Sequence, residues 1–299
     1  MTRFDLSRVT TPFIELNDLK RITSAGRPSS IATRLFADAW AALVGGVALD
    51  AVAGSIVGRG LAAARLGDLD ATVLLVAGVP RPAVRSILIE AAEAVAGDLL
   101  VPLRSMVEQG FDRDDRESPA GPAFVAALAM QPRAGITCPG KPRIMLEPPE
   151  NHAEHCLMVA LYGVLLSPLY GADPGRVFLA GLAHHFHNAG MPDSGFTGEV
   201  LLGPYLKTLM DHHTAACLAQ LSPALRHTVE QARAVLPDTT TPEGQAFHAA
   251  DVLDRVLQLN QYMRASALTP ERMLGEMELV HAGPVKGFQD EVLRQAGLL

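Results

Sequence analysis

The sequence is poor in cysteine and in aromatic residues, and both shortages narrow the fold. Three cysteines among 299 residues are too few and too scattered for a disulfide framework, and no Cys-x-x-Cys pair occurs. Aromatic residues make up 5% of the chain, with one tryptophan, whereas alanine and leucine are abundant. Small and unbranched side chains favour packed helices over sheets. We therefore predict an all-α protein suited to the reducing cytoplasm.

Long uncharged apolar runs and an excess of positive charge are also missing. The most apolar segment, residues 39–58, is interrupted by Asp50 and several glycines, so it falls short of the roughly 18 uncharged residues of a membrane span. Residues 1–8 carry charges where a secretory signal needs an apolar core. The net charge of -7 gives no general attraction to a phosphate backbone. We expect a small-molecule ligand, with neither a membrane nor a nucleic-acid duplex as partner.

Proline and glycine divide the chain into two parts. Residues 131–149 contain five prolines and two glycines, which exclude a continuous helix. We predict a helical N-terminal region over residues 1–130 without an assigned role, a Pro-rich linker over 131–149 and a second helical domain over 150–299. Residues 71–79 fit either a strand or a helix. The apolar N-terminal helices must be covered by the second domain or by another copy of the chain, so a homo-oligomer is one expectation.

All ten histidines lie after residue 150, and several of them stand at the ends of apolar helical stretches. They are His152, His155, His184, His185, His187, His212, His213, His227, His248 and His281. Asn151 is a suitable N-cap, which places His155 in the first turns of a buried helix. His184 and His185 end a second apolar helix, and Asp251 lies among apolar residues of a third. A single histidine on an apolar face is usually a core residue, but this grouping predicts a transition-metal site.

Three segments carry a recognisable combination. Residues 150–155 read Glu-Asn-His-Ala-Glu-His, residues 184–185 read His-His, and residues 249–253 read Ala-Ala-Asp-Val-Leu. Together they resemble the HD-domain superfamily of metal-dependent phosphohydrolases, and most closely its bacterial 5'-deoxynucleotidase-like branch. The resemblance covers about residues 143–260. It implies an HD-domain-like helical bundle and a metal-dependent hydrolase acting on a nucleotide or another small phosphate ester.

The resemblance also implies a set of metal ligands, which are His155, His184, His185 and Asp251. In the family the histidine of the central pair is followed by an aspartate, and here His185 replaces it. A neutral imidazole ligates one ion through one nitrogen, but it cannot bridge two ions as a carboxylate does. We therefore expect one divalent transition-metal ion, namely Zn, Fe, Co, Ni or Mn.

Further residues acquire catalytic roles through the same resemblance. In the nucleotidase-like branch, a Glu three places and an Asp eight places after the central pair activate water and protonate the leaving group. Their counterparts are Asn188, which cannot act as a base, and Asp193, which either transfers protons or belongs to an ordinary turn. His187 is a possible substitute base. Arg143 roughly matches an upstream phosphate-binding arginine of the family, or is a solvated arginine of the linker.

Three functions compete at this point. The leading hypothesis is a cytoplasmic phosphohydrolase of the phosphomonoesterase or nucleotidase type, with a small phosphorylated substrate. The second is a non-catalytic HD-like binding or regulatory protein, because the expected base is missing at Asn188. The third is a di-iron HD oxygenase, which requires a bridging carboxylate that His185 has removed.

Overall fold

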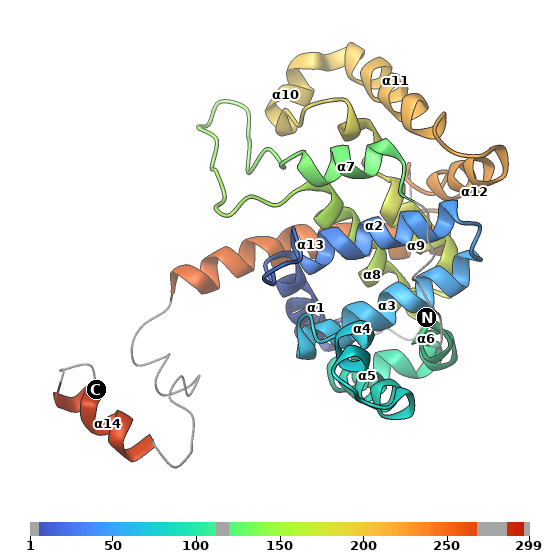
Figure 1. Cartoon of the computed structure of the whole chain (residues 1–299). Coiled ribbons are helices and arrows are strands. Elements are labelled where there is room, and N and C mark those ends of the chain that lie inside the picture. The colour runs from blue at the N-terminus through green and yellow to red at the C-terminus, as the bar shows by residue number, and fades with distance from the viewer. Residues whose placement is uncertain (1–5, 112–119, 238, 268–285, 296–299) are drawn as a thin grey trace. The chain divides into compact units, whose positions relative to one another are not determined.

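A computed structural model describes residues 6–111, 120–237, 239–267 and 286–295, and their regular structure is helical (Figure 1). Extended pairing within these residues is limited to isolated bridges, so the all-α prediction is confirmed. The chain divides into two compact units, Met1–Leu257 and Gln258–Leu299. The helices, with η for a 3-10 helix, are α1 (Ser7–Asn17), η1 (Asp18–Lys20), α2 (Ile31–Val44), α3 (Leu49–Leu66), α4 (Ala71–Val76), α5 (Arg81–Ala96), η2 (Gly97–Leu103), α6 (Arg104–Phe111), α7 (Ala123–Met130), α8 (His152–Tyr170), α9 (Pro174–Ala183), η3 (Phe186–Ala189), α10 (Gly195–Leu202), η4 (Gly203–Tyr205), α11 (Leu206–Leu218), α12 (Pro223–Arg233), α13 (Pro242–Ser266) and α14 (Lys286–Gln295).

Helix α8 lies at the centre of the first unit. Asn151 caps it as predicted, because the Asn151 side chain accepts the N–H of Glu154 at 2.9 Å and the Glu154 carboxylate accepts the N–H of Asn151 at 3.0 Å. Every side chain from His152 to Ser167 is buried. Among the described residues this is the one helix with the length and apolar character of a membrane span, but 83% of its apolar window lies inside the protein. It is therefore a core helix.

The N-terminal helices share this core. Phe13 of α1 stacks on Tyr162 of α8 with ring centroids 4.0 Å apart, and Trp40 of α2 meets Phe124 of α7 and Phe186 of η3 at 5.0 and 5.4 Å. Buried apolar side chains form one continuous cluster from α1 to α13. The expectation that residues before 131 pack against the later helices is thus confirmed. The segment 71–79, ambiguous in sequence, begins with the short helix α4.

Helices α8 and α9 cross unusually closely and in opposite directions. A Cβ atom added to Gly181 of α9 would lie 2.6 Å from the Cα of Ala160 in α8. On the facing side, one added to Gly163 of α8 would lie 2.5 Å from Val177 Cγ1. Glycine lets the two backbones approach where any larger residue would separate them. As a result, the C-terminal end of α9 is held against the first turn of α8.

The segment 131–149 contains no helix, as its prolines predict. It folds back on itself through paired Ile136 and Ile144, whose backbone hydrogen bonds measure 2.9 and 3.0 Å. The N–H of Arg133 donates to the carbonyl of Glu150 at 2.8 Å, which joins the start of the segment to its end. The segment is therefore a folded loop beside the N-terminus of α8.

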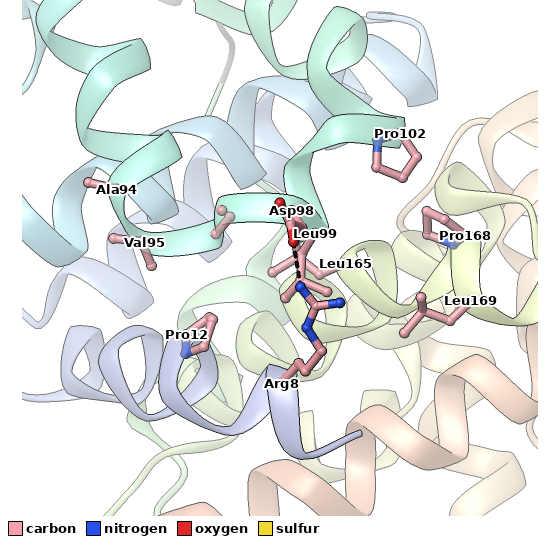
Figure 2. Close-up of a pocket in the computed structure, with 12 residues that line it drawn as sticks. Arg8, Pro12, Ala94, Val95, Asp98, Leu99, Pro102, Leu165, Pro168 and Leu169 are labelled. Atoms are coloured by element: carbon pink, nitrogen blue, oxygen red, sulfur yellow. Dashed lines mark hydrogen bonds and ion pairs between the residues drawn. The ribbon is translucent and has the colours of Figure 1, made fainter. Parts of the chain in front are cut away.

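A cavity of about 290 Å³ lies between α1, the start of η2 and the C-terminal half of α8 (Figure 2). Its lining is largely apolar and includes Pro12, Leu99 and Leu165, with the ion pair of Arg8 and Asp98 among the lining side chains. No histidine is among these lining residues. The cavity is thus separate from the histidine-rich ends of α8 and α9.

Candidate metal centre

Three histidines bring their ring nitrogens together where α8 begins and α9 ends. His155 lies in the first turn of α8 and is completely buried, whereas His184 and His185 follow the last residue of α9 and are partly exposed. One ring nitrogen of each lies within 4.8 Å of the other two. The closest contact joins Nε2 of His155 and Nε2 of His184 at 3.1 Å. Three of the four predicted ligands therefore form one group.

The second ring nitrogen of each histidine faces an acceptor. These Nδ1 contacts are to Asp254 Oδ2 at 2.7 Å for His155, to the carbonyl of Gly181 at 2.7 Å for His184, and to Asn188 Oδ1 at 2.8 Å for His185. Because these oxygens only accept, each Nδ1 carries the proton, and in the neutral ring each Nε2 is left with its lone pair. Each of the three rings thus keeps an unprotonated Nε2 with which it can bind a metal ion, and for His155 and His184 these two atoms face each other.

Two lone pairs cannot face each other at 3.1 Å, so either a metal ion lies between them or His155 carries a second proton on Nε2, within reach of His184 Nε2 and Asp251 Oδ1. The choice is a proton or a metal ion. Burial, together with the neighbouring histidines, holds the pKa values of His184 and His185 well below the usual range, which disfavours the proton on these rings. Neutral imidazole nitrogens prefer Zn²⁺ and its first-row neighbours to Mg²⁺. The donor set therefore fits a divalent transition-metal ion.

Asp251 of α13 adjoins this group through His155. Its Oδ1 lies 3.3 Å from His155 Nε2, and its Oδ2 lies 3.1 Å from an amino group of Arg255. Burial acts to raise the pKa of Asp251, but the hydrogen bond and charge of His155 outweigh it, so the pKa lies below its usual range. Asp251 is therefore an ionised oxygen donor next to His155, but it is not part of the set of donor atoms that all lie within 4.8 Å of one another.

A buried charge network lies behind His155. Asp254 is completely buried and accepts from Lys20 Nζ at 2.7 Å and from Asn17 Nδ2 at 3.2 Å, in addition to His155. Lys20 also donates to Glu150 at 2.5 Å. Burial lowers the pKa of Lys20, yet Asp254 and Glu150 together raise it above the usual value, so the ammonium group persists.

This network explains a second group of residues that could bind a metal ion. Donor atoms of Glu150, His155 and Asp254 also lie within 4.8 Å of one another. The Lys20 ammonium group already bridges the two carboxylates, so they have a cation of their own. Sequence reasoning missed both Lys20 and Asp254. The one available signal was that Asp254 follows Asp251 by three places, which puts both carboxylates on one face of a helix.

Asp193, a predicted acid or base, is held by the backbone. Its two oxygens accept the N–H groups of Ala134 and Gly195, each at 2.9 Å, and Oδ2 lies 3.5 Å from Nε2 of the buried His152. Burial acts to raise the pKa of Asp193, but His152 and the two N–H groups bring it below the usual range. The carboxylate therefore stays ionised, which suits a proton acceptor better than a donor.

His187 and Asn188 lie on the other side of His185. The His187 ring centroid is 5.4 Å from that of His185, and burial, helped by Arg233, lowers the pKa of His187 to about 4. His187 is therefore a neutral and weakly basic ring at neutral pH. Asn188 uses Oδ1 to orient His185 and Nδ2 to reach the carbonyl of Met191 at 3.2 Å. Asn188 therefore orients His185, a candidate ligand.

The two arginines of the loop 131–149 have different positions. Arg143 donates to the carbonyls of Ala134 at 2.9 Å and Ser194 at 3.3 Å, so it braces the backbone near Asp193. Arg133 instead donates to Nε2 of His185 at 3.3 Å. The sequence pointed to Arg143, and only the folded loop shows that Arg133 is the arginine that contacts the histidine group.

Comparison with protein-family models, with curated proteins and with solved structures gave no match. Of the histidines, His281 lies outside the described residues. The functional conclusion therefore rests on the chemistry of the group formed by His155, His184 and His185.

Proposed function

We propose that this protein is a cytoplasmic, HD-like phosphohydrolase that uses one divalent transition-metal ion, held by His155, His184, His185 and Asp251, to cleave a small phosphate ester. The observation that carries the proposal is the 3.1 Å contact between the Nε2 atoms of His155 and His184, whose Nδ1 atoms both face acceptors. A divalent ion in such a site supplies Lewis-acid polarisation of a phosphate oxygen and a bound water of lowered pKa.

The residues around the group suit an anionic substrate. Lys20 and Arg133 together balance the charges of Glu150 and Asp254, which reduces the repulsion between these carboxylates and a phosphate group. Arg133 brings a guanidinium group to His185, on the side where the centre is partly exposed. Guanidinium groups bind phosphate oxygens through charge-assisted hydrogen bonds. Arg133 thus takes the phosphate-binding role that the resemblance had suggested for Arg143.

The site contains weak bases for proton transfer. Asp193 is an ionised carboxylate of low basicity, and His187 is neutral with a pKa of about 4. Either group can accept a proton from water, though neither has the pKa near neutrality that favours rapid general-base catalysis. Asn188 stands where the resembling branch has its glutamate, and it is occupied with His185. These features favour a second candidate function, a metal-binding protein without turnover.

Metal analysis and a substrate screen distinguish the two. The full chain, purified without an affinity tag, is analysed by plasma mass spectrometry before and after reconstitution with Zn²⁺, Co²⁺ or Mn²⁺. We expect about one ion per chain for the wild type, a large loss in His184→Ala, and no change in His227→Ala, which alters an exposed histidine of α12. Phosphate release from nucleoside 5'-monophosphates and sugar phosphates by the loaded protein would support the hydrolase.

The negative outcomes are equally informative. A loaded protein that hydrolyses no phosphate monoester would be a non-catalytic metal binder. A protein that binds no transition metal under any of these conditions would contradict both functions.

A further inference from the structure

Two arginines contact donor atoms of the predicted metal ligands. Arg133, from the loop 131–149, donates to Nε2 of His185 at 3.3 Å, and Arg255, from α13, lies 3.1 Å from Oδ2 of Asp251. Their side chains are 22% and 56% exposed. Arg133 is therefore partly buried and Arg255 is exposed, and both guanidinium groups lie next to atoms that a cation would use.

Each arginine contacts a lone pair or a negative charge that a bound cation would also use. His185 has one available lone pair, on Nε2, because its Nδ1 donates to Asn188. A cation that takes this lone pair leaves the N–H of Arg133 without its acceptor. In the same way, a cation that draws on the charge of Asp251 weakens the attraction of Asp251 for Arg255. Cation binding thus weakens one contact of each guanidinium group, so that N–H donors of both become available to an anion next to the centre.

The remaining charges around the centre are already matched. Lys20 lies between two carboxylates, and Glu150 also lies 3.5 Å from Arg133. Among the charged side chains that these contacts link to His155, His185 and Asp251, three are cationic and three are anionic, and Asp193, beside His152, lies outside this set. A divalent ion adds two positive charges to the set. The six are Lys20, Arg133, Arg255, Glu150, Asp251 and Asp254. The complementary ligand therefore carries two negative charges.

We propose that Arg133 and Arg255 form an anion receptor that is uncovered when a divalent cation binds the histidine group, and that its ligand is the dianionic form of a phosphate monoester or phosphonate. This inference rests on the proposed metal site and extends it, because it assigns Arg255 and names the charge class of the substrate. Linkage requires the cation and the anion to strengthen each other's binding by the same factor.

Calorimetric titration of the full chain tests this proposal without relying on catalysis. The probe is phenylphosphonate, a dianion at mildly alkaline pH that has no ester bond to cleave, and the comparison ligand is the monoanion benzenesulfonate. Both are titrated into metal-free and Zn²⁺-loaded protein. We expect phenylphosphonate to bind the loaded protein about 100-fold more tightly than the metal-free protein. Benzenesulfonate should gain much less.

Arginine variants separate the receptor from direct attraction between cation and anion. In Arg255→Gln, the affinity of the loaded protein for phenylphosphonate should fall about tenfold, because one charge-assisted hydrogen bond is lost, while the metal-free protein should show no change. The matched control is Arg104→Gln, which removes an exposed arginine of α6 with the same spacing to its partner, Glu108. Circular dichroism confirms that each variant is folded.

Each outcome decides a different point. Wild-type affinity of Arg255→Gln for phenylphosphonate in the loaded state would refute the receptor, whatever the enzyme activity. An equal loss in the loaded and metal-free states would refute the uncovering by the cation. Cation-dependent binding of phenylphosphonate that needs Arg255, in a protein that hydrolyses no phosphate ester, would support the receptor and contradict the hydrolase.

Discussion

Asp254 determines which nitrogen of His155 faces the other histidines, and the nearly isosteric change Asp254→Asn should reverse that choice. In the wild type, the carboxylate accepts the Nδ1 proton of His155 and also accepts from Lys20. An asparagine has one carbonyl oxygen, and Lys20 can only donate, so the oxygen must turn toward Lys20. The NH₂ group then faces His155, whose Nδ1 must accept. The proton moves to Nε2, the atom that points at His184.

Two measurable losses follow from this change. Disturbing the partner that orients a ligand histidine typically lowers metal affinity by about 10- to 100-fold. In this variant Lys20, whose side chain is 1% exposed, loses the charge of Asp254 and keeps the ion pair with Glu150. Removing one member of a buried ion pair costs about 3 to 5 kcal/mol in the free energy of unfolding. The variant should therefore be both less stable and weaker in Zn²⁺ binding.

The second change Lys20→Met distinguishes the tautomer from general damage. Without the ammonium group, Asn17 keeps only a longer, neutral hydrogen bond to that side of residue 254, so the asparagine amide turns its oxygen back to His155 more readily. The double variant should therefore bind Zn²⁺ more tightly than Asp254→Asn alone. Chelator competition gives the Zn²⁺ affinities, and nitrogen-15 NMR of the imidazole rings reports the tautomer in the metal-free protein. Unchanged Zn²⁺ affinity in Asp254→Asn, with the proton of His155 still on Nδ1, would refute this reasoning.

Three further changes probe other parts of the centre. Acidification should destabilise the metal-free protein, because the lowered pKa values of His184, His185 and His187 mean that the unfolded chain binds more protons. Each histidine lowers the free energy of unfolding by up to about 1.4 kcal/mol per pH unit below its pKa in the unfolded chain, and for His187 this loss falls between pH 6.5 and about 4. Urea titrations that show a constant free energy of unfolding over this interval would contradict these shifts. Gly181→Ala should cost about 1 to 3 kcal/mol and weaken Zn²⁺ binding by forcing α9 away from α8; Gly287→Ala, with open space around it, is the control. His185→Asp should shift metal preference from Zn²⁺ toward Mg²⁺ or Mn²⁺, as oxygen ligands suit hard ions; an unchanged preference would place His185 outside the coordination sphere.

Local sequence determined much of the secondary structure and the position of the main ligands within it. Asn151 caps α8 because its side chain reaches the backbone three residues away, and the prolines of 131–149 exclude a helix wherever they stand. His155, His184 and His185 stand out because polar rings interrupt apolar helical runs. Such signals act over one or two helical turns, so they can be read without the fold. The resemblance to HD-domain proteins stays a hypothesis, because it concerns the arrangement of the helices.

Only the tertiary structure decided what surrounds those histidines. Lys20 and Asp254 are 234 positions apart, yet they form a buried pair behind His155. Lys20 has no local pattern that predicts its burial, and the spacing of Asp254 from Asp251 does not identify its partner, since a charged side chain is stable in the core only when the fold supplies one. The choice of Arg133 over Arg143 likewise depends on how one loop folds back. Sequence therefore specified the candidate ligand residues, and long-range packing specified their tautomers, charges and neighbours, because those properties depend on contacts made only after the chain has folded.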